Sequence, residues 1–210
     1  MAFVLGIAST DPNVPGIQAL FLSKVPELSD SGASGYVFFS KAFENPDSAG
    51  APMMGGLFGN LTLQDTHDEE AMLALMAPIV EEAAERFPGS NTTLFPVFEK
   101  YDSFLEWYEV TFDQSPAGTN RWTGSRLLGE EALAGDVDAL AGNLDRLWDK
   151  GVDVVVVLIV GGEGVHEAEP RGGGNAVLPA WRWAYAHFSE LFSTLLLPVL
   201  DRGHEWGLTW

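Results

Sequence analysis

Hydrophobic and polar residues alternate along this chain with two different periods, which predicts strands with helices between them. Apolar residues recur at helical spacing over residues 15–28, 66–83, 103–112 and 137–148. Segments typical of strands are residues 1–10, 36–39, 53–61, 92–98, 121–128, 152–161 and 176–188. Only a loop, residues 44–52, separates the second strand from the third. The pattern therefore predicts an α+β fold with an antiparallel or mixed sheet flanked by helices.

Two of the predicted strands carry most of the further expectations. Residues 152–161 are nearly all valine, leucine and isoleucine, which is typical of a strand covered on both faces. A polar, glycine-rich loop is expected over residues 163–174. In the strand expected over residues 176–188, the side chains of Trp181, Trp183 and Tyr185 share one aromatic face. We expect one domain over residues 1–188 and a C-terminal tail over residues 189–210, in which a short helix is possible.

Composition and charge exclude several classes of protein. The 210 residues include 11 Lys and Arg against 30 Asp and Glu, a net charge of −19, which argues against binding to nucleic acid or to an anionic membrane. The longest apolar run is far shorter than the roughly 20 residues of a membrane helix. No cysteine is present, so disulfides, zinc–thiolate sites and a cysteine nucleophile are excluded.

The cellular location is not indicated. Residues 1–10 lack the positive charge that begins a signal peptide. Two glycosylation sequons, Asn60-Leu61-Thr62 and Asn91-Thr92-Thr93, leave secretion of a parent protein open, because such sequons also arise by chance.

Candidate chemistry in the residues themselves is sparse. The serine-hydrolase elbow, the H-E-x-x-H zinc motif and the phosphate-binding P-loop are all absent from the sequence. His166 follows the end of the strand expected at 152–161, where it can line a cleft and exchange a proton or remain a solvated loop residue. His166, Glu167 and Glu169 form the densest polar group in the chain, but adjacent residues on an extended segment point in alternating directions, so no metal site is expected there. Arg182 and His187 lie among aromatic residues, a setting that suits either a ligand anion or a core carboxylate.

Three separate segments together resemble one family. They are Val25-Pro26-Glu27-Leu28-Ser29-Asp30-Ser31-Gly32-Ala33-Ser34-Gly35-Tyr36, then Gly118-Thr119-Asn120-Arg121 with Gly124-Ser125-Arg126-Leu127-Leu128, and finally Asn175-Ala176-Val177-Leu178-Pro179-Ala180-Trp181-Arg182. In this order they resemble landmarks of the FAD-linked oxidases related to berberine bridge enzyme, especially the fungal members with a PCMH-type flavin-binding domain.

The resemblance implies that this chain is a substrate-domain fragment, an antiparallel sheet that caps a flavin ring and forms one wall of an active site. The family's flavin-binding domain, which carries the residues for covalent attachment of FAD, has no match here. The family's closing Asn-Tyr segment has no match in residues 189–210 either. We therefore expect a truncated or spliced product, or a gene model that covers part of a longer protein.

The resemblance also suggests roles for individual residues. Gly161-Gly162 is similar to a Gly-Gly that precedes the catalytic acidic residue of the berberine-bridge branch, and counting onward places His166 at that position. Tyr185, Arg182 and Trp181 are expected at the substrate site, the last two chiefly as its supports. Residues that bind the cofactor cannot be assigned.

Two functions remain open at the level of sequence. The first is an FAD-dependent oxidase that passes a hydride from a small organic substrate to FAD, which oxygen then reoxidises. The partner of this chain would then be a flavin-binding domain, in a longer chain or in another one. The second is a stand-alone acidic α+β domain that binds a ligand or a protein, and whose apolar cleft face favours a homodimer.

Overall fold

The computed structural model describes residues 1–46, 50–112, 121–169 and 176–193, and these form a seven-stranded sheet in which every pairing is antiparallel. Its strand order is β4-β1-β3-β2-β6-β7-β5. The strands are β1 (Ala2–Ala8), β2 (Ala33–Phe43), β3 (Met54–Leu63), β4 (Thr93–Val97), β5 (Arg121–Leu128), β6 (Val154–Ile159) and β7 (Ala186–Ser193). The predicted α+β fold with an antiparallel sheet is confirmed.

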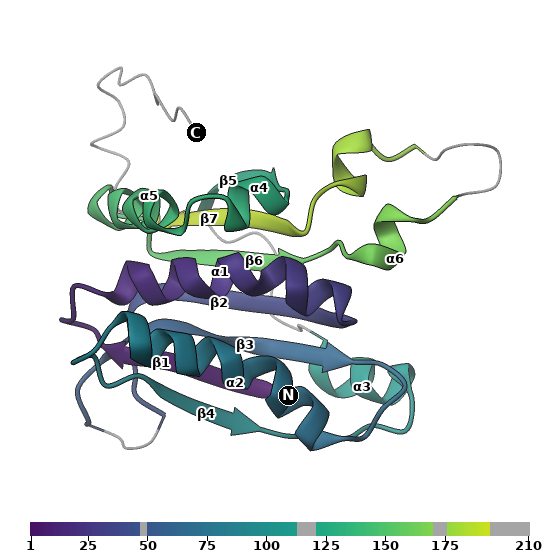
Figure 1. Cartoon of the computed structure of the whole chain (residues 1–210), viewed down its shortest axis with the longest axis horizontal. Coiled ribbons are helices and arrows are strands. Elements are labelled where there is room, and N and C mark those ends of the chain that lie inside the picture. The colour runs from purple at the N-terminus through teal and green to yellow at the C-terminus, as the bar shows by residue number, and fades with distance from the viewer. Residues whose placement is uncertain (47–49, 113–120, 170–175, 194–210) are drawn as a thin grey trace.

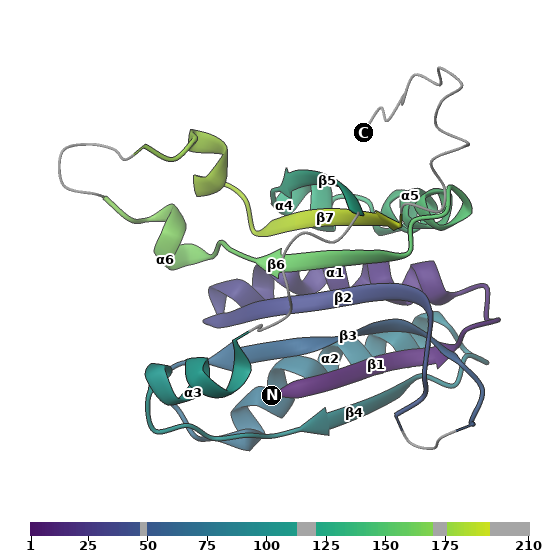
Figure 2. The ribbon, with the colours of Figure 1, turned by 180° about the vertical axis from the view of Figure 1, so that it is seen from behind.

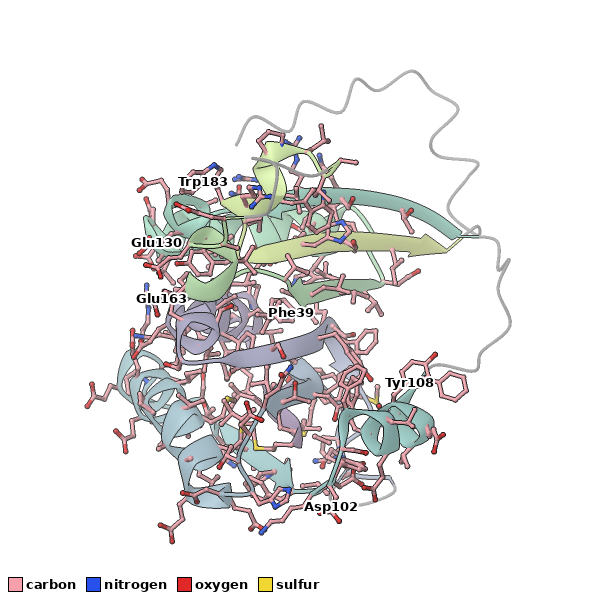
Figure 3. All side chains as sticks on the ribbon, turned by 90° about the vertical axis from the view of Figure 1, so that its right-hand side faces the viewer. Phe39, Asp102, Tyr108, Glu130, Glu163 and Trp183 are labelled. Atoms are coloured by element: carbon pink, nitrogen blue, oxygen red, sulfur yellow. The ribbon has the colours of Figure 1, made fainter. Side chains whose placement is uncertain are left out.

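Within the described residues, helices cover one face of this sheet and leave most of the other without a helical layer (Figures 1 and 2). The helices are α1 (Val14–Asp30), α2 (Glu69–Arg86), α3 (Phe104–Thr111), α4 (Glu130–Ala134), α5 (Val137–Asp149) and α6 (Glu163–His166). α1 crosses the middle of the sheet and contacts α2, α4 and α5. The short helix α3 lies on the opposite side, as the edge-on view of Figure 3 shows. We call the two sides the covered face and the open face.

The hydrophobic core lies between the sheet and α1. Phe21 of α1 is fully buried, with its ring 6.0 Å from that of Phe3 and 6.1 Å from that of Phe39. Full burial of such side chains contributes roughly 1.5–3 kcal/mol each. The core therefore holds α1 to the strands in the middle of the sheet.

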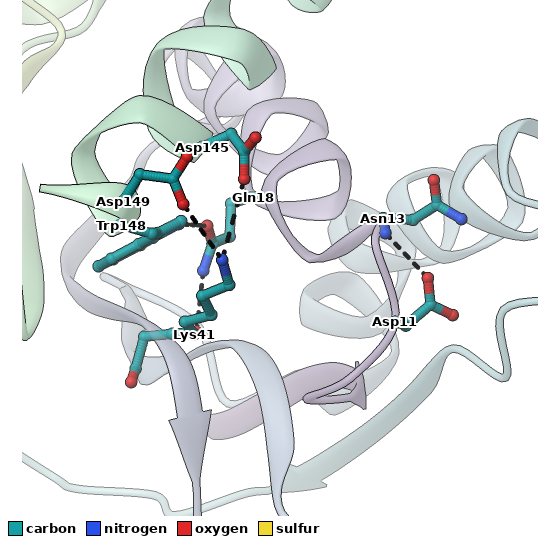
Figure 4. Close-up of polar contacts among 8 residues, drawn as sticks. Asp11, Asn13, Gln18, Lys41, Asp145, Trp148 and Asp149 are labelled. Atoms are coloured by element: carbon teal, nitrogen blue, oxygen red, sulfur yellow. Dashed lines mark hydrogen bonds and ion pairs between the residues drawn. The ribbon is translucent and has the colours of Figure 1, made fainter. Parts of the chain in front are cut away.

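A buried polar link fixes α1 and α5 on the covered face (Figure 4). The side chain of Gln18 is fully buried, and its Nε2 donates to the carbonyl oxygens of Ser40, at 3.0 Å, and Gly56, at 2.8 Å. Its Oε1 accepts a hydrogen bond of 2.9 Å from Nε1 of Trp148 in α5. One amide thus satisfies polar groups of two strands and a second helix, which buried polar groups require.

β6 is covered on one face only, which corrects the expectation for residues 152–161. Val155, Val157 and Ile159 are buried against the helices, whereas Val154, Val156 and Leu158 alternate with them and are half-buried on the open face. An apolar run predicts burial on both faces but cannot show what provides it. Within the described residues, no helical layer lies over this part of the open face.

The strand expected over residues 176–188 is also partly wrong. Pro179–Arg182 forms a 3-10 helix, and β7 begins only at Ala186. Proline has a fixed φ and no N–H, so Pro179 favours the first turn of a helix over a strand. β7 runs through Ser193, so the domain boundary expected at residue 188 falls inside this strand.

Smaller differences concern helix ends and loops. α2 begins after Asp68, and not after Thr66, where the helical spacing over residues 66–83 begins. Oδ1 of Asp68 accepts from the backbone N–H groups of Glu70 and Ala71. The first four residues of the expected loop 163–174 form α6. Residues 172–175 and most of the expected tail helix lie outside the described residues. Among the described helices, none is long and apolar enough to cross a membrane.

Candidate functional site

The antiparallel register arranges the side chains of the open face in two rows that cross four strands. Residues directly opposite each other in an antiparallel pair point to the same face. The first row reads Asn60, Tyr36, Leu158 and His187, and the second reads Phe58, Phe38, Val156 and Ser189. These eight residues define the centre of the open face, with a polar row beside a mainly apolar row.

Aromatic rings pack side by side in this centre. The rings of Phe38 and Phe58 are stacked, with centroids 5.3 Å apart, and Tyr36 meets Phe38 edge-on at 5.6 Å. Nδ2 of Asn60 donates to the hydroxyl oxygen of Tyr36 at 3.2 Å. Because Tyr36 accepts this bond, its own hydroxyl hydrogen remains available to a ligand.

A cavity of about 660 Å³ adjoins the polar row. Its lining includes Tyr36, Asn60 and Leu158 from the sheet, Tyr101 from the segment after β4, and Trp107 from α3. Cavities of this size are common at small-molecule sites, which combine apolar walls with a few polar groups. The cavity therefore borders the open face at the end of the sheet, where residues of α2 and α3 also line it.

α3 presents apolar side chains to the outside on this same face. Phe104 is 70% exposed and Val110 is 66% exposed, and no residue of α3 is buried. The helix is nevertheless well capped, because Oγ of Ser103 accepts from the backbone N–H of Glu106 at 3.2 Å. The predicted amphipathic helix forms, but within the described part of the chain its apolar face is not packed into a core.

His166 and Tyr185 come together, but beside the end of α1. Their rings meet edge to face with centroids 4.5 Å apart, and the Tyr185 hydroxyl donates to Oδ2 of Asp30, the last residue of α1, at 3.0 Å. Burial, with a smaller contribution from the bond to Asp30, raises the pKa of Tyr185 to about 12. Nε2 of His166 is buried and finds no hydrogen-bond partner among the described residues. Figure 3 shows Glu163, at the start of α6, on the same side of the sheet as α1.

Trp181 and Arg182 face different surroundings. The Trp181 ring lies 5.3 Å from the ring of His187, at an angle of 63°, so Trp181 borders the open face. Nη1 of Arg182 donates to the carbonyl oxygen of Ala168 at 3.4 Å, and its Nη2 is buried with no partner in the part of the chain that the structure describes. The four residues predicted for the site therefore do not form one constellation. In the described residues, no group of His, Asp and Glu side chains has metal-site geometry.

Tyr36 and Asn60 are the residues that sequence reasoning missed. Tyr36 was visible only as part of an aromatic strand, and Asn60 only as part of a sequon. Their pairing depends on the register between β2 and β3. The sequence of the loop that joins these two strands does not reveal that register. The alternation Tyr36, Phe38 in one strand and Phe58, Asn60 in the next was the available signal.

No protein-family model matches the sequence, and no curated protein matches it. Among solved structures, the VAO-type flavoprotein MtVAO713 from Myceliophthora thermophila C1 superposes with a TM-score of 0.70 at 24% identity, over 90% of this chain and 33% of that one. The chain therefore shares the fold of about a third of this flavoprotein. MtVAO615 from the same organism gives a TM-score of 0.60 at 16% identity, over 96% and 35% of the two chains.

The two faces of the sheet are covered to different extents within the described residues. The chain spans about a third of the length of each flavoprotein that it matches. Its covered face is packed beneath helices, whereas its open face carries half-buried apolar side chains and borders the cavity.

Proposed function

We propose that this chain is the substrate domain of an FAD-dependent oxidoreductase that acts on a small organic substrate, and that the open face covers the flavin. One observation carries the proposal: β6 is apolar on both faces, yet helices cover only one of them. Val154, Val156 and Leu158 stay half-buried beside the rings of Phe38 and Phe58. A soluble domain that exposes such a patch commonly uses it for binding.

The open face fits a flavin in its chemistry. An isoalloxazine ring is flat, with an apolar end and an end rich in hydrogen-bonding atoms. The row of Phe58, Phe38 and Val156 offers a flat apolar surface, and the polar row next to it offers Asn60, Tyr36 and His187. When bound, FAD would supply the hydride-accepting chemistry.

The residues of this chain would bind and orient the substrate. The apolar row excludes water from the reacting region, and the hydroxyl of Tyr36 and the amide of Asn60 hold polar groups of the substrate. The proposal also includes covalent attachment of FAD, reoxidation of the flavin by oxygen and the berberine-bridge type of chemistry. They are supported by the three segments that resemble this family.

The catalytic role of His166 and the substrate contacts of Tyr185, Arg182 and Trp181 stay predictions. His166→Ala in a flavin-loaded form would test the first, because loss of a proton acceptor lowers the rate by roughly 100-fold or more. A purely structural His166 would instead lower stability and leave the rate per folded molecule unchanged.

The test of the proposal uses riboflavin and the methyl resonances of β6. Riboflavin carries the isoalloxazine ring without phosphate groups, so the net charge of −19 does not repel it. We expect its addition to shift the methyl signals of Val156 and Leu158 and to leave those of Val155 and Val157 unchanged. Shifts confined to the covered face, or no shifts at all, would contradict the proposal.

Two variants form a matched control. Phe38→Asp places a charge in the apolar row and should abolish the shifts. Leu73→Asp places the same charge on α2, where Leu73 is already 37% exposed on the covered side, and should leave them intact.

A second candidate function is a non-catalytic binding domain, and the exposed side chains of α3 favour it. In that case riboflavin has no effect on β6, and the chain forms a homodimer through its open side. Sedimentation over a range of concentrations, with Phe104→Glu as the variant that separates the subunits, distinguishes the two candidates.

A further inference from the structure

Two histidines near the same end of the sheet lie on opposite faces of it. In β7, Ala186 and Phe188 are buried in the core under the helices, so His187 between them points to the open face. The register agrees, because His187 lies opposite Leu158, which lines the cavity.

His166 belongs to the other side. Its ring packs against Tyr185, which is bonded to Asp30 at the end of α1. The segment that leads to it is fixed there too, since Oγ of Ser29 in α1 donates to the carbonyl oxygen of Gly161 at 2.6 Å. The backbone of Gly162 has a φ of 124°, and a Cβ there would lie 2.9 Å from the carbonyl oxygen of Ser29. Glycine at this position thus lets the chain pass close to α1.

The ring of His187 is held from two directions. The indole of Trp181 packs against it at 5.3 Å, and Oγ of Ser189, the next residue on the same face, lies 3.5 Å from its Nε2. Within the described residues, Nδ1 of His187 forms no hydrogen bond. A neutral imidazole can both donate and accept a hydrogen bond.

Tyr36 occupies the same row two strands away. Adjacent strands lie about 4.8 Å apart, so roughly 10 Å separates the backbones that carry Tyr36 and His187, with Leu158 between them. A ligand seated over Leu158 would have a phenol at one end and an imidazole at the other.

We propose that His187 is the side chain through which the open face forms a hydrogen bond with the polar part of its ligand, and that His166 lies outside this contact. The inference rests on the proposed function, since it takes the open face to be the surface that covers the flavin. Trp181 and Ser189 are positioning residues, because they act through the ring of His187.

The experiment follows the imidazole Cε1–Hε1 signals during a riboflavin titration. We expect the signal of His187 to shift together with the methyl signals of Val156 and Leu158, and the signal of His166 to stay in place. His187→Leu should raise the Kd for riboflavin about threefold to tenfold, the effect of losing one hydrogen bond. His187→Gln keeps a hydrogen-bonding amide and should recover most of the affinity. His166→Ala should leave the Kd unchanged.

The outcomes separate the two proposals. If the methyl signals shift while His187 does not, or if His187→Leu binds as well as the natural chain, the role of His187 is wrong and the proposed function stands. If neither the methyl nor the imidazole signals shift, the proposed function fails with it. If His166 shifts and His187 does not, the assignment of the two histidines is reversed.

Discussion

Phe38 and Phe39 are neighbours in β2, yet their side chains lie in different surroundings. Phe39 is fully buried beneath α1, whereas Phe38 lies half-buried on the open face, stacked on Phe58. The same difference separates Val157 from Val156 in β6. The covered face is packed as a protein core. The open face has a similarly apolar composition, but within the described residues no layer of helices packs over it.

This comparison indicates which residues hold the fold together and which are free to serve a ligand. Polar groups of the covered face form hydrogen bonds with one another, as Gln18 does with Trp148 and with the carbonyl of Ser40. Residues of the open face retain unused surface and, at Tyr36, an unused hydroxyl hydrogen. Substitutions on the two faces should therefore differ in what they damage.

The largest difference is expected between Phe39→Ala and Phe38→Ala. Removing the fully buried ring of Phe39 should lower the free energy of unfolding by about 3–5 kcal/mol, because it leaves a cavity beneath α1. Removing Phe38 should cost about 1 kcal/mol, since its ring is already half in water. Urea unfolding followed by circular dichroism measures both values. Equal losses would mean that the open face is packed as tightly as the core.

A somewhat smaller loss is expected for Gln18→Ala. It leaves two strand carbonyls and the Trp148 indole N–H buried without partners, which should lower the free energy of unfolding by about 3 kcal/mol. Trp148→Phe removes the indole donor and part of the ring but keeps the bonds from Gln18 to the strands, and it serves as the control, with a smaller loss of about 1–2 kcal/mol. If both variants lose the same amount, the bonds from Gln18 to the strands contribute nothing.

The dependence of stability on pH tests the contact between Tyr185 and Asp30 at the end of α1. The pKa of Tyr185 is raised to about 12, above the value near 10 of an unfolded tyrosine, so the folded state favours the neutral phenol. Its contribution to stability is fully present below pH 10 and is lost as the pH rises from about 10 to about 12. Urea unfolding at several pH values should show this loss, and Tyr185→Phe should reduce it.

Tyr101 provides the matched control for this measurement. Its pKa is also raised to about 12, chiefly by the hydrogen bond that its hydroxyl donates to Glu99 at 2.6 Å, but it lies at the surface. Solvent screens such a bond, so Tyr101→Phe should change the pH dependence less than Tyr185→Phe. The opposite order would show that the contact between Tyr185 and Asp30 is weak.

Much of the fold was predictable because local signals agreed with the final packing. Over Val137–Asp149 the apolar spacing, the acidic cap at Asp136 and the stop near Gly151 all indicate one helix, and α5 forms there. The strand predicted around Trp181 was wrong, because the residues there alternate as in a strand whereas Pro179 starts a 3-10 helix. Alternation is a weak guide where proline fixes the backbone.

The candidate site was less predictable than the fold for a physical reason. Chain order places His166 and His187 near the same strand ends, but the face of His166 depends on the close passage of Gly162 beside Ser29, and that of His187 depends on the register of β7 on β6. Likewise, the bond between Asn60 and Tyr36 exists only in one register of β2 on β3. Such contacts between distant segments are absent from local patterns of polarity.

The smallest expected effects concern the caps of two helices on opposite sides of the sheet. Oδ1 of Asp136 accepts from the N–H of Ala139 at 2.9 Å at the start of α5, and Ser103 caps α3 in the same way. Asp136→Ala should lower the free energy of unfolding by about 1 kcal/mol, because α5 buries Leu140, Leu144, Leu147 and Trp148 in the core. Ser103→Ala should change it by less than about 0.5 kcal/mol, since α3 buries no residue and can fray without disturbing the sheet.

Hydrogen exchange should instead show faster exchange of the α3 amides in Ser103→Ala. Riboflavin bound on the open face should slow that exchange only if α3 closes over the ligand, so the same measurement tells whether this helix is a passive edge or part of the site.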